Sequence, residues 1–164
     1  MKIALATDHA GFEQLKELKT YLESLSHECR DFGPKEFDPS DDYPDFILPA
    51  AKAVGSGECE AGVILGRSGQ GEAMAANRLK GVRCALFYGK AVAIEAVDAS
   101  GKTSQDPYEI IRRSRLHNHA NMLSLAASYV DIEEMKKVLK IWLDTAYSDE
   151  ERHARRVAKF DQET

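Results

Sequence analysis

The segment Gly66-Arg-Ser-Gly-Gln-Gly-Glu72 has the residue types and spacing of a site that binds an anion. Its glycines follow a GxxGxG pattern, which matches neither the GxGxxG fingerprint of dinucleotide-binding folds nor the GK[ST] ending of a P-loop. Such a loop can aim successive backbone N–H groups at a phosphate or a developing oxyanion, although an ordinary tight turn is the alternative. Ser68 and Glu72 flank the loop. A carboxylate at this position can act as a general base or only interact with the helix dipole.

Histidines and arginines elsewhere in the chain could serve the same chemistry. His117 and His119 form an HxH pair, but further ligands with zinc-like spacing are missing, so we expect no bound metal. Arg152 and Arg156 lie four residues apart, which places both on one face of a predicted helix. Paired guanidinium groups match phosphate geometry, although such a pair is also typical of a solvated helix face.

The order of apolar and polar segments predicts the scaffold that must position these groups. Apolar runs typical of buried strands alternate with segments whose apolar residues recur with the period of a helix. We expect strands at 2–7, 27–32, 60–65, 83–88 and 121–127, and helices at 12–26, 43–56, 72–79, 131–146 and 149–160. Residues 89–114 have no clear period. The alternation predicts a parallel sheet covered on both faces by right-handed crossovers.

Polar residues are concentrated where the predicted strands end. Ligands of open parallel sheets bind in the crevice beyond the carboxyl ends of the strands. We expect four polar groups at this edge: residues 8–11, residues 66–72, the region after Tyr88 and the segment 115–121. Their predicted convergence is the main argument from the residues for a single binding site.

Composition excludes several classes of protein. The 164 residues carry a formal net charge of −5, which argues against a uniformly basic face for nucleic acid. No apolar run approaches the about 20 residues that a membrane-spanning helix needs, and the apolar start is too short for a secretory signal. We therefore expect a cytoplasmic protein without a membrane or nucleic-acid partner. Cys29, Cys59 and Cys84 lack CxxC or zinc spacing, which favours reduced structural thiols.

Five ordered motifs, which span nearly the whole chain, resemble the ribose-5-phosphate isomerase B family, which also includes the galactose-6-phosphate isomerase subunits. They are MKIALATDHAGF at the start, DYPDF at 42–46, SGQGEAMAANRLKGVRCAL from Ser68 to Leu86, HNHANML at 117–123 and RHARR at 152–156. The resemblance implies one Rossmann-like domain over residues 1–164, a three-layer α/β/α sandwich with a five-stranded parallel sheet. It also implies aldose–ketose isomerisation of a sugar phosphate without metal or organic cofactor, in a homodimer with shared active sites.

The resemblance further implies roles for individual residues. The family supplies its proton-transfer base either as a cysteine at the position of Gly66 or as a glutamate at the position of Glu72, so this chain resembles the glutamate subgroup. His117 resembles the acid/base that opens the furanose ring, and Ser68 completes the candidate catalytic residues. The residues that resemble sugar contacts are Asp8, Tyr43, Ser68 and Asn118; those that resemble phosphate ligands are His9, Arg152 and Arg156; and the backbone of Gly69, Gln70 and Gly71 resembles the anion hole.

The chain departs from the family pattern in two places. Family members often carry a phosphate-binding arginine where this chain has Ser128, and Arg67 could replace it. The connection from Arg83 to His117 is longer than in typical members and contains an insert at about 95–112. We expect isomerisation of ribose 5-phosphate to ribulose 5-phosphate. A hexose 6-phosphate such as allose or galactose 6-phosphate, or a non-catalytic phosphosugar-binding module, is the alternative; a nucleotide-binding domain is least supported because no nucleotide loop matches.

Overall fold

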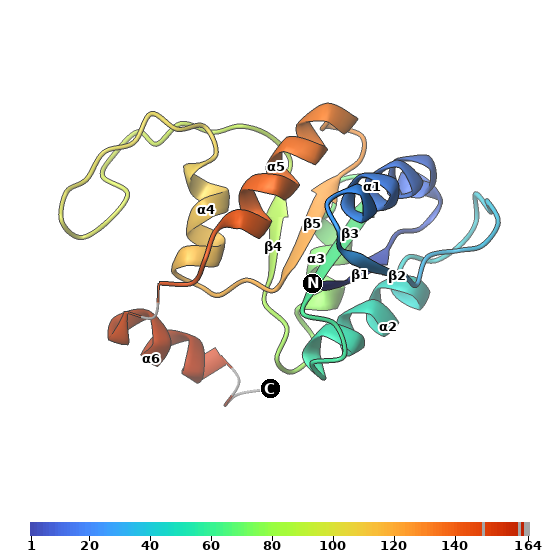
Figure 1. The fold of residues 1–164 in the computed structure, drawn as a ribbon, viewed down its shortest axis with the longest axis horizontal. Helices are drawn as coiled ribbons and strands as arrows, with labels where there is room; N and C mark the ends of the chain where they lie inside the picture. The colour runs from blue at the N-terminus through green and yellow to red at the C-terminus, as the bar shows by residue number, and fades with distance from the viewer. Residues whose placement is uncertain (149, 161, 163–164) are drawn as a thin grey trace.

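A computed structural model describes residues 1–148, 150–160 and 162 of the chain. Within these residues the strands form one five-stranded sheet in which every neighbouring pair is parallel, in the order β2-β1-β3-β5-β4 (Figure 1). The strands are β1 (Lys2–Ala6), β2 (Glu28–Asp31), β3 (Ala61–Gly66), β4 (Cys84–Phe87) and β5 (Met122–Ala126). The predicted α/β class with a parallel sheet is confirmed.

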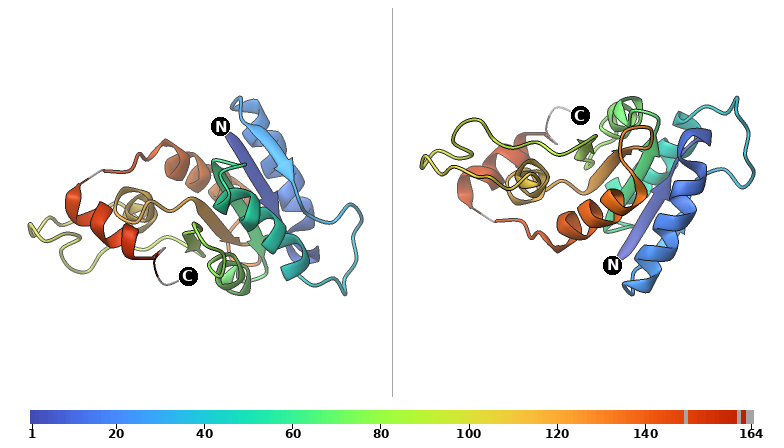
Figure 2. Two further views of the ribbon diagram at one scale, coloured as in Figure 1. Left: turned by 90° about the horizontal axis from the view of Figure 1, so that it is seen from below. Right: turned by 90° about the horizontal axis from the view of Figure 1, so that it is seen from above.

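Helices cover both faces of this sheet (Figures 1 and 2). They are the 3-10 helix η1 (His9–Gly11), α1 (Phe12–Ser24), α2 (Pro44–Gly55), α3 (Gln70–Ala76), α4 (Glu109–Leu116), α5 (Ile132–Asp144) and α6 (Glu151–Phe160). One layer contains α1, α4 and α5, and the opposite layer contains α2 and α3. None of the described helices is long and apolar enough to cross a membrane.

The side chains of β1 show how the sheet contributes to two cores. Ile3 and Leu5 pack in a cluster with residues of α1 and α5, whereas Ala4 and Ala6 pack with residues of α2 on the other face. All four side chains are fully buried. Burial on both faces explains why the strand is a continuous apolar run rather than an alternation of apolar and polar residues.

Local sequence features explain where two of the helices begin. Pro44 lies in the first turn of α2, where its missing N–H group would have no helical partner in any case. Asp131 is the N-cap of α5, and its side chain accepts a hydrogen bond of 2.9 Å from the backbone N–H of Glu134. The buried residues of α5 recur with the helical period and are Met135, Val138, Leu139 and Trp142.

The segment without a clear period contains a helix that the sequence analysis did not predict. Residues 88–108 are largely irregular, and α4 follows them from Glu109. α4 buries only Ile111, so its apolar period is too weak to be read from the sequence. The segment expected as an insert, 95–112, comprises most of the irregular stretch and the first turn of α4. The helix expected at 149–160 is α6, and residue 149 lies outside the described residues.

Candidate active site

The predicted site residues lie at opposite edges of the sheet (Figure 1). Asp8 follows β1 and Gly66 ends β3, so both lie at the carboxyl edge of the parallel strands. His117 lies between α4 and the start of β5, which places it at the amino edge. The expectation that residues 115–121 lie at the carboxyl edge is therefore wrong, because a segment that leads directly into a strand lies at the amino end of that strand.

Two groups of residues follow from this division, and they are named here by the edge where they lie. The carboxyl-edge group contains Asp8, His9, Tyr43, Arg67, Ser68, Gly69, Gln70, Gly71 and Glu72, and the amino-edge group contains His117, Asn118, Arg152 and Arg156. Within one chain the fold places each group at its own edge and keeps the two groups apart.

The glycine loop connects β3 to α3 through a backbone turn that only glycine adopts without strain. Gly69 is the N-cap of α3 and has a left-handed backbone with φ of 72°. A Cβ atom there would lie 2.7 Å from Leu86 and 2.9 Å from the Ser124 hydroxyl oxygen. The Ser124 hydroxyl donates a 2.7 Å hydrogen bond to the Gly69 carbonyl, which fixes the loop to β5. The first N–H groups of α3 have no partners within the helix and lie beside this turn.

Glu72 is the acidic residue in the first turn of α3, and it is buried, with 5% of its surface exposed. A Cβ atom on Gly66 would overlap the Glu72 carboxyl carbon and both of its oxygens, so the carboxyl group lies directly over the end of β3. Burial is the main cause that raises the pKa of Glu72; a backbone hydrogen bond opposes the shift, and the charge of Asp8 adds to it. A carboxylate with a raised pKa is a stronger base for abstracting a proton from carbon.

The cysteines do not offer an alternative base in this structure. All three are free, and none lies in the glycine loop. Burial raises the pKa of Cys29 to about 11 and that of Cys84 to about 12. The thiolate form that a nucleophile or base requires is therefore scarce at neutral pH.

Asp8, His9 and Asp41 form a cluster beside the start of η1. The Asp8 carboxylate accepts a 2.9 Å hydrogen bond from the backbone N–H of Ala10. His9 Nδ1 lies 2.7 Å from Asp41 Oδ1 and 3.7 Å from Asp8 Oδ2. Potential metal-ligand atoms of the three residues lie within 4.8 Å of one another. Because His9 Nδ1 and Asp41 Oδ1 are already hydrogen-bonded to each other, we assign no metal to this cluster.

Tyr43 and Arg67 extend the carboxyl-edge group around the glycine loop. A Cβ atom on Gly71 would lie 2.9 Å from the Tyr43 ring carbon Cζ and hydroxyl oxygen, so the Tyr43 ring packs against the Gly71 backbone. Arg67 is exposed, and its positive charge acts to lower the pKa of His9. Arg67 therefore adds positive charge to the edge where His9 lies.

Two tyrosines that the sequence analysis missed also lie at this edge. Tyr88 and Tyr129 line a cavity of about 260 Å³ together with Ser68 and Gln70. Their exposed fractions are 59% and 72%, which is high for large aromatic residues. Both follow the carboxyl end of a strand, Tyr88 after β4 and Tyr129 after β5, and this placement is the one signal that could have found them.

At the amino edge, His117 lies in a largely cationic environment. Its Nε2 lies 2.8 Å from an Nη atom of Arg113, and its ring centroid lies 4.1 Å from that of His153. Burial lowers the pKa of His117, and the neighbouring charges of His153, Arg113 and Arg152 lower it further. His117 is therefore held largely neutral at neutral pH, which lets it exchange a proton with a bound hydroxyl group.

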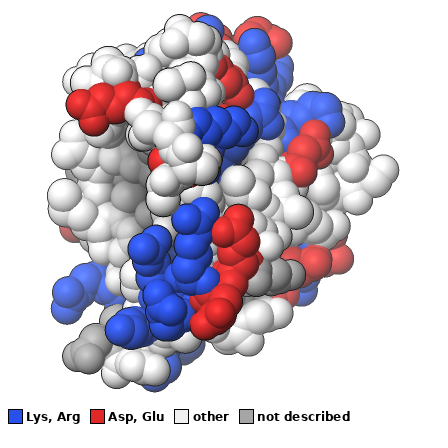
Figure 3. All heavy atoms as spheres, turned by 90° about the vertical axis from the view of Figure 1, so that its left-hand side faces the viewer, with Lys and Arg blue, Asp and Glu red and all other residues white. Residues whose placement is uncertain are grey.

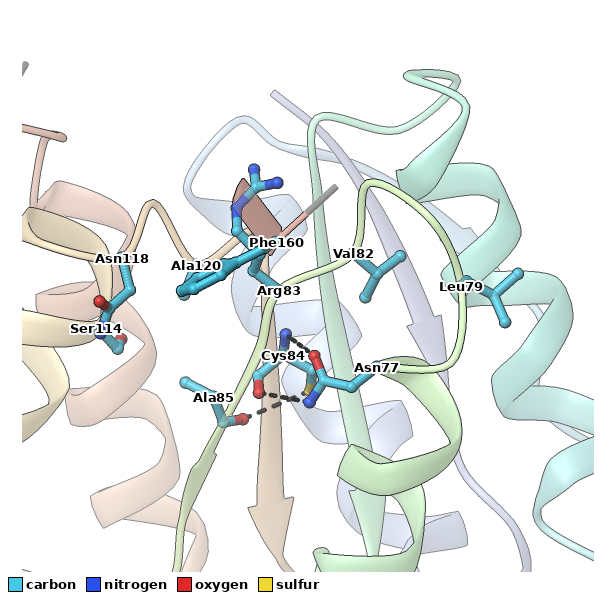
Figure 4. A pocket seen from close by; sticks show the side chains of 10 residues that line it. All are labelled: Asn77, Leu79, Val82, Arg83, Cys84, Ala85, Ser114, Asn118, Ala120 and Phe160. Carbon is cyan, nitrogen blue, oxygen red and sulfur yellow. Dashed lines mark hydrogen bonds between the residues drawn. The ribbon is translucent and has the colours of Figure 1, made fainter. Parts of the chain in front are cut away.

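The rest of the amino-edge group is more exposed. Lys and Arg side chains gather on the face of the molecule where α6 lies (Figure 3). Arg152 is half-buried and pairs with Glu150 at 2.8 Å, and Arg156 is exposed. Asn118 lines a cavity of about 430 Å³ with residues that include Cys84 and Phe160 (Figure 4). These side chains do not reach the carboxyl-edge group of the same chain.

Known proteins resemble this chain along nearly its whole length. The family described as Ribose/Galactose Isomerase matches residues 3–101 and 103–160. Ribose-5-phosphate isomerase B of Mycolicibacterium paratuberculosis is 32% identical over 157 residues, which cover 96% of this chain and 87% of that protein. A putative sugar phosphate isomerase of Bacillus subtilis is 31% identical over 160 residues, which cover 98% of this chain and 95% of that protein.

Solved structures share the fold. Ribose-5-phosphate isomerase B of Clostridium thermocellum is 33% identical with a TM-score of 0.83, covering 99% of this chain and 96% of that chain. The enzyme of Mycoplasma genitalium, solved with bound ribulose-5-phosphate, is 29% identical with a TM-score of 0.84, covering 99% and 95%. The fold and these relatives together define a sugar-phosphate isomerase. This chain belongs to the Ribose/Galactose Isomerase family.

Proposed function

We propose that the protein interconverts ribose 5-phosphate and ribulose 5-phosphate through an enediolate, with Glu72 as the base and without metal or cofactor. The observation that carries this proposal is the position of Glu72, which is buried and whose carboxyl group lies over the end of β3 at the glycine loop. The names of the relatives support the substrate, because several of them are ribose-5-phosphate isomerases B.

In the proposed reaction, one proton moves between two adjacent carbons of the open-chain sugar. The Glu72 carboxylate takes the proton from C2, and the electron pair moves through the C1–C2 bond to the C1 carbonyl oxygen. The resulting enediolate oxygen is stabilised by backbone N–H groups of Gly69, Gln70 and Gly71. Glu72 then returns the proton to C1, while the hydroxyl proton of O2 is transferred to O1, so that the C2 carbonyl and the C1 hydroxyl group form together. A positioned base contributes roughly 10²–10⁴-fold and each oxyanion donor about 10²–10³-fold.

The contact between Gly66 and Glu72 supports the glutamate as the base. Any side chain at position 66 would occupy the space of the Glu72 carboxyl group. A cysteine base at 66 and a glutamate base at 72 are therefore alternatives that compete for one place. Because residue 66 is glycine in this chain, the Glu72 carboxyl group occupies that space.

The separation of the two groups supports an active site shared between subunits. We assign ring opening to His117 and phosphate binding to Arg152 and Arg156, and all three lie at the edge opposite Glu72. In a two-fold homodimer, the amino-edge group of one subunit can meet the carboxyl-edge group of its partner, and the symmetry creates two equal sites. We propose this homodimer as the active form.

The phosphate group would be bound by cations from both edges. His9 and Arg67 lie at the carboxyl edge, and Arg152 and Arg156 come from α6 of the partner. Arg67 thereby takes the place of the arginine that many family members carry at the position of Ser128. Binding energy from the phosphate orients the reacting carbons without contacting them.

A panel of sugar phosphates tests the proposed reaction. The purified protein is assayed for isomerisation of ribose 5-phosphate, allose 6-phosphate and galactose 6-phosphate, with and without EDTA. We expect the highest kcat/KM with ribose 5-phosphate and no loss in EDTA. A preference for a hexose 6-phosphate would change the substrate but keep the chemistry. Binding without turnover of any of them would favour the phosphosugar-binding module, and loss of turnover in EDTA would contradict the metal-free mechanism.

A further inference from the structure

We propose that Asp41 is a positioning residue that holds the His9 ring with Nδ1 toward itself, so that Nε2–H of a cationic His9 donates to the phosphate group. This inference rests on the proposed function, because it assigns the phosphate of the substrate to His9. Asp41 lies immediately before the DYPDF motif and 32 residues from His9 in the sequence, and no motif predicts the contact.

The geometry fixes both the position and the rotation of the His9 ring. Asp41 Oδ1 accepts a 3.0 Å hydrogen bond from the His9 backbone N–H and lies 2.7 Å from His9 Nδ1. One carboxylate oxygen therefore binds the backbone and the ring of the same residue. With Nδ1 engaged, Nε2 on the far side of the ring is the remaining nitrogen that can donate to a ligand.

The environment of Asp41 favours a charged pair over a neutral contact. The Asp41 side chain is only 9% exposed, and its second oxygen, Oδ2, is buried without a hydrogen-bond partner among the described residues. A buried carboxylate with one unsatisfied oxygen is costly unless a positive charge lies beside it. The protonated ring of His9 supplies that charge at 2.7 Å, and charge-assisted hydrogen bonds of this kind are the stronger ones.

Some of the groups around His9 raise the pKa of its ring and others lower it. The hydrogen bond to Asp41 is the largest influence and raises the pKa of His9, and the charges of Asp8 and Asp41 raise it further. Burial and the positive charge of Arg67 lower it, and the net direction is upward. Asp38, on the same loop as Asp41, also senses the positive charge of His9, which helps to lower the pKa of Asp38. Because the pKa of His9 is raised, the cationic form persists to higher pH and is lost as the pH rises through that value.

A purely structural role for Asp41 is the competing explanation, since the same oxygen anchors the loop of residues 33–43 to η1. The variant Asp41→Asn separates the two roles. Its side-chain oxygen can still accept both hydrogen bonds and hold the loop, but the negative charge is gone. Asp38→Asn is the matched control, because Asp38 lies in the same loop and hydrogen-bonds to Ser40 rather than to His9.

The first measurement is an NMR titration of the His9 imidazole in the ¹⁵N-histidine-labelled protein. In the wild type, the neutral ring should keep its proton on Nδ1, because Asp41 accepts it. In Asp41→Asn, the titration of His9 should move to lower pH, whereas Asp38→Asn should leave it nearly unchanged. A neutral His9 with its proton on Nε2, or an unchanged titration in Asp41→Asn, would overturn the proposal. The wild-type arm decides the matter even if the variant does not fold.

The second measurement is competitive inhibition by inorganic phosphate together with the steady-state parameters. Asp41→Asn should raise the phosphate inhibition constant and KM by roughly tenfold while kcat changes little. In a His9→Gln background the same change should have no further effect on either constant. A lower melting temperature with unchanged KM would reduce Asp41 to a loop anchor. If no sugar phosphate is turned over but the NMR shift appears, the proposed function fails while the Asp41–His9 pair stands.

Discussion

The carboxyl edge and the amino edge of the sheet differ in how deeply their candidate site residues are buried. At the carboxyl edge, Glu72 and Asp8 are 5% and 6% exposed, and the glycine loop is fixed by Ser124. At the amino edge, Asn118 and Arg156 are exposed side chains on a helix or a helix end. In the proposed reaction, the carboxyl edge carries out proton transfer from carbon, which tolerates little misplacement. In the same proposal, the amino edge supplies Arg152 and Arg156, which bind the charged phosphate group.

The pKa values of Glu72 and His117 are shifted in opposite directions, and burial is the largest cause of both shifts. Burial raises the pKa of Glu72 and lowers the pKa of His117. The raised pKa makes Glu72 a stronger base, whereas the lowered pKa keeps the His117 ring neutral at neutral pH. The comparison teaches that burial favours the neutral form of an acid and of a base alike, so that it shifts their pKa values in opposite directions.

Removing the Glu72 carboxylate at the carboxyl edge should have the largest effect on kcat. Glu72→Gln should lower kcat by roughly 10²–10⁴-fold and keep the fold and phosphosugar binding, because the amide has nearly the same shape but cannot take a proton. Steady-state kinetics and ligand titration check this. Glu133→Gln is the matched control, since Glu133 lies in the first turn of α5 and its side chain is 77% exposed. Near-normal kcat in Glu72→Gln would remove Glu72 from the mechanism.

Displacing the Glu72 carboxylate without removing it should lower kcat by a smaller factor. Gly66→Ala places a methyl group where the Glu72 carboxyl group lies, so the base must move. A misplacement of about 1 Å can cost about 10²-fold, and we expect a loss of kcat of that order. In the Glu72→Gln background, Gly66→Ala should add little to the loss. Equal losses in both backgrounds would mean that Gly66 matters for folding of the loop rather than for the position of Glu72.

Substitutions at the amino edge should weaken the binding of substrate and phosphate more than they lower kcat. Arg152→Ala or Arg156→Ala should each cost roughly 1.5–3 kcal/mol in affinity for substrate and for inorganic phosphate, if their hydrogen bonds are charge-assisted. Calorimetric titration with phosphate measures this directly. Arg155→Ala is the control on the same helix, where Arg155 lies 4.0 Å from Glu151. Unchanged affinity in both variants would leave RHARR as a solvated helix face.

Shortening the irregular segment should give the smallest effect. It begins beside Tyr88 at the carboxyl edge, and its Asp98 lies 3.7 Å from Arg113, the residue that contacts His117. Deletion of part of residues 92–106 should shift the ratios of kcat/KM among the sugar phosphates while the fold persists. Far-ultraviolet circular dichroism controls for folding. Unchanged ratios across the panel would place the segment outside the substrate pocket.

Much of the fold could be predicted because its central strands β3 and β5 are buried along their whole length. β3 is a continuous apolar run and β5 is apolar except for Ser124, and such segments mark central parallel strands in the sequence itself. α4 could not be predicted, because it buries only Ile111 and its stability depends on neighbours that the sequence does not show. Local signals, such as Asp131 and Glu134 at the start of α5, needed no tertiary information.

The candidate site was predictable where it is local and not where it depends on tertiary contacts. Glu72 and the glycine loop lie within seven consecutive residues, so their spacing carries the chemistry. Asp41 contacts His9, which lies 32 residues away in the sequence, and Ser124 contacts Gly69, which lies 55 residues away. No spacing rule predicts such contacts. The edge occupied by residues 115–121 was predicted wrongly, because polar residues before a strand and after a strand look alike in the sequence.

The central claim is that one active site takes Glu72 from one subunit and His117 from its partner, and remixing two inactive variants tests it most directly. Glu72→Gln and His117→Asn homodimers should each be nearly inactive. A mixed dimer then has one site with both changes and one site with neither, and random remixing makes half of the molecules mixed. Activity should therefore recover to about a quarter of the wild-type value. No recovery, with subunit exchange confirmed by native mass spectrometry, would contradict the shared site.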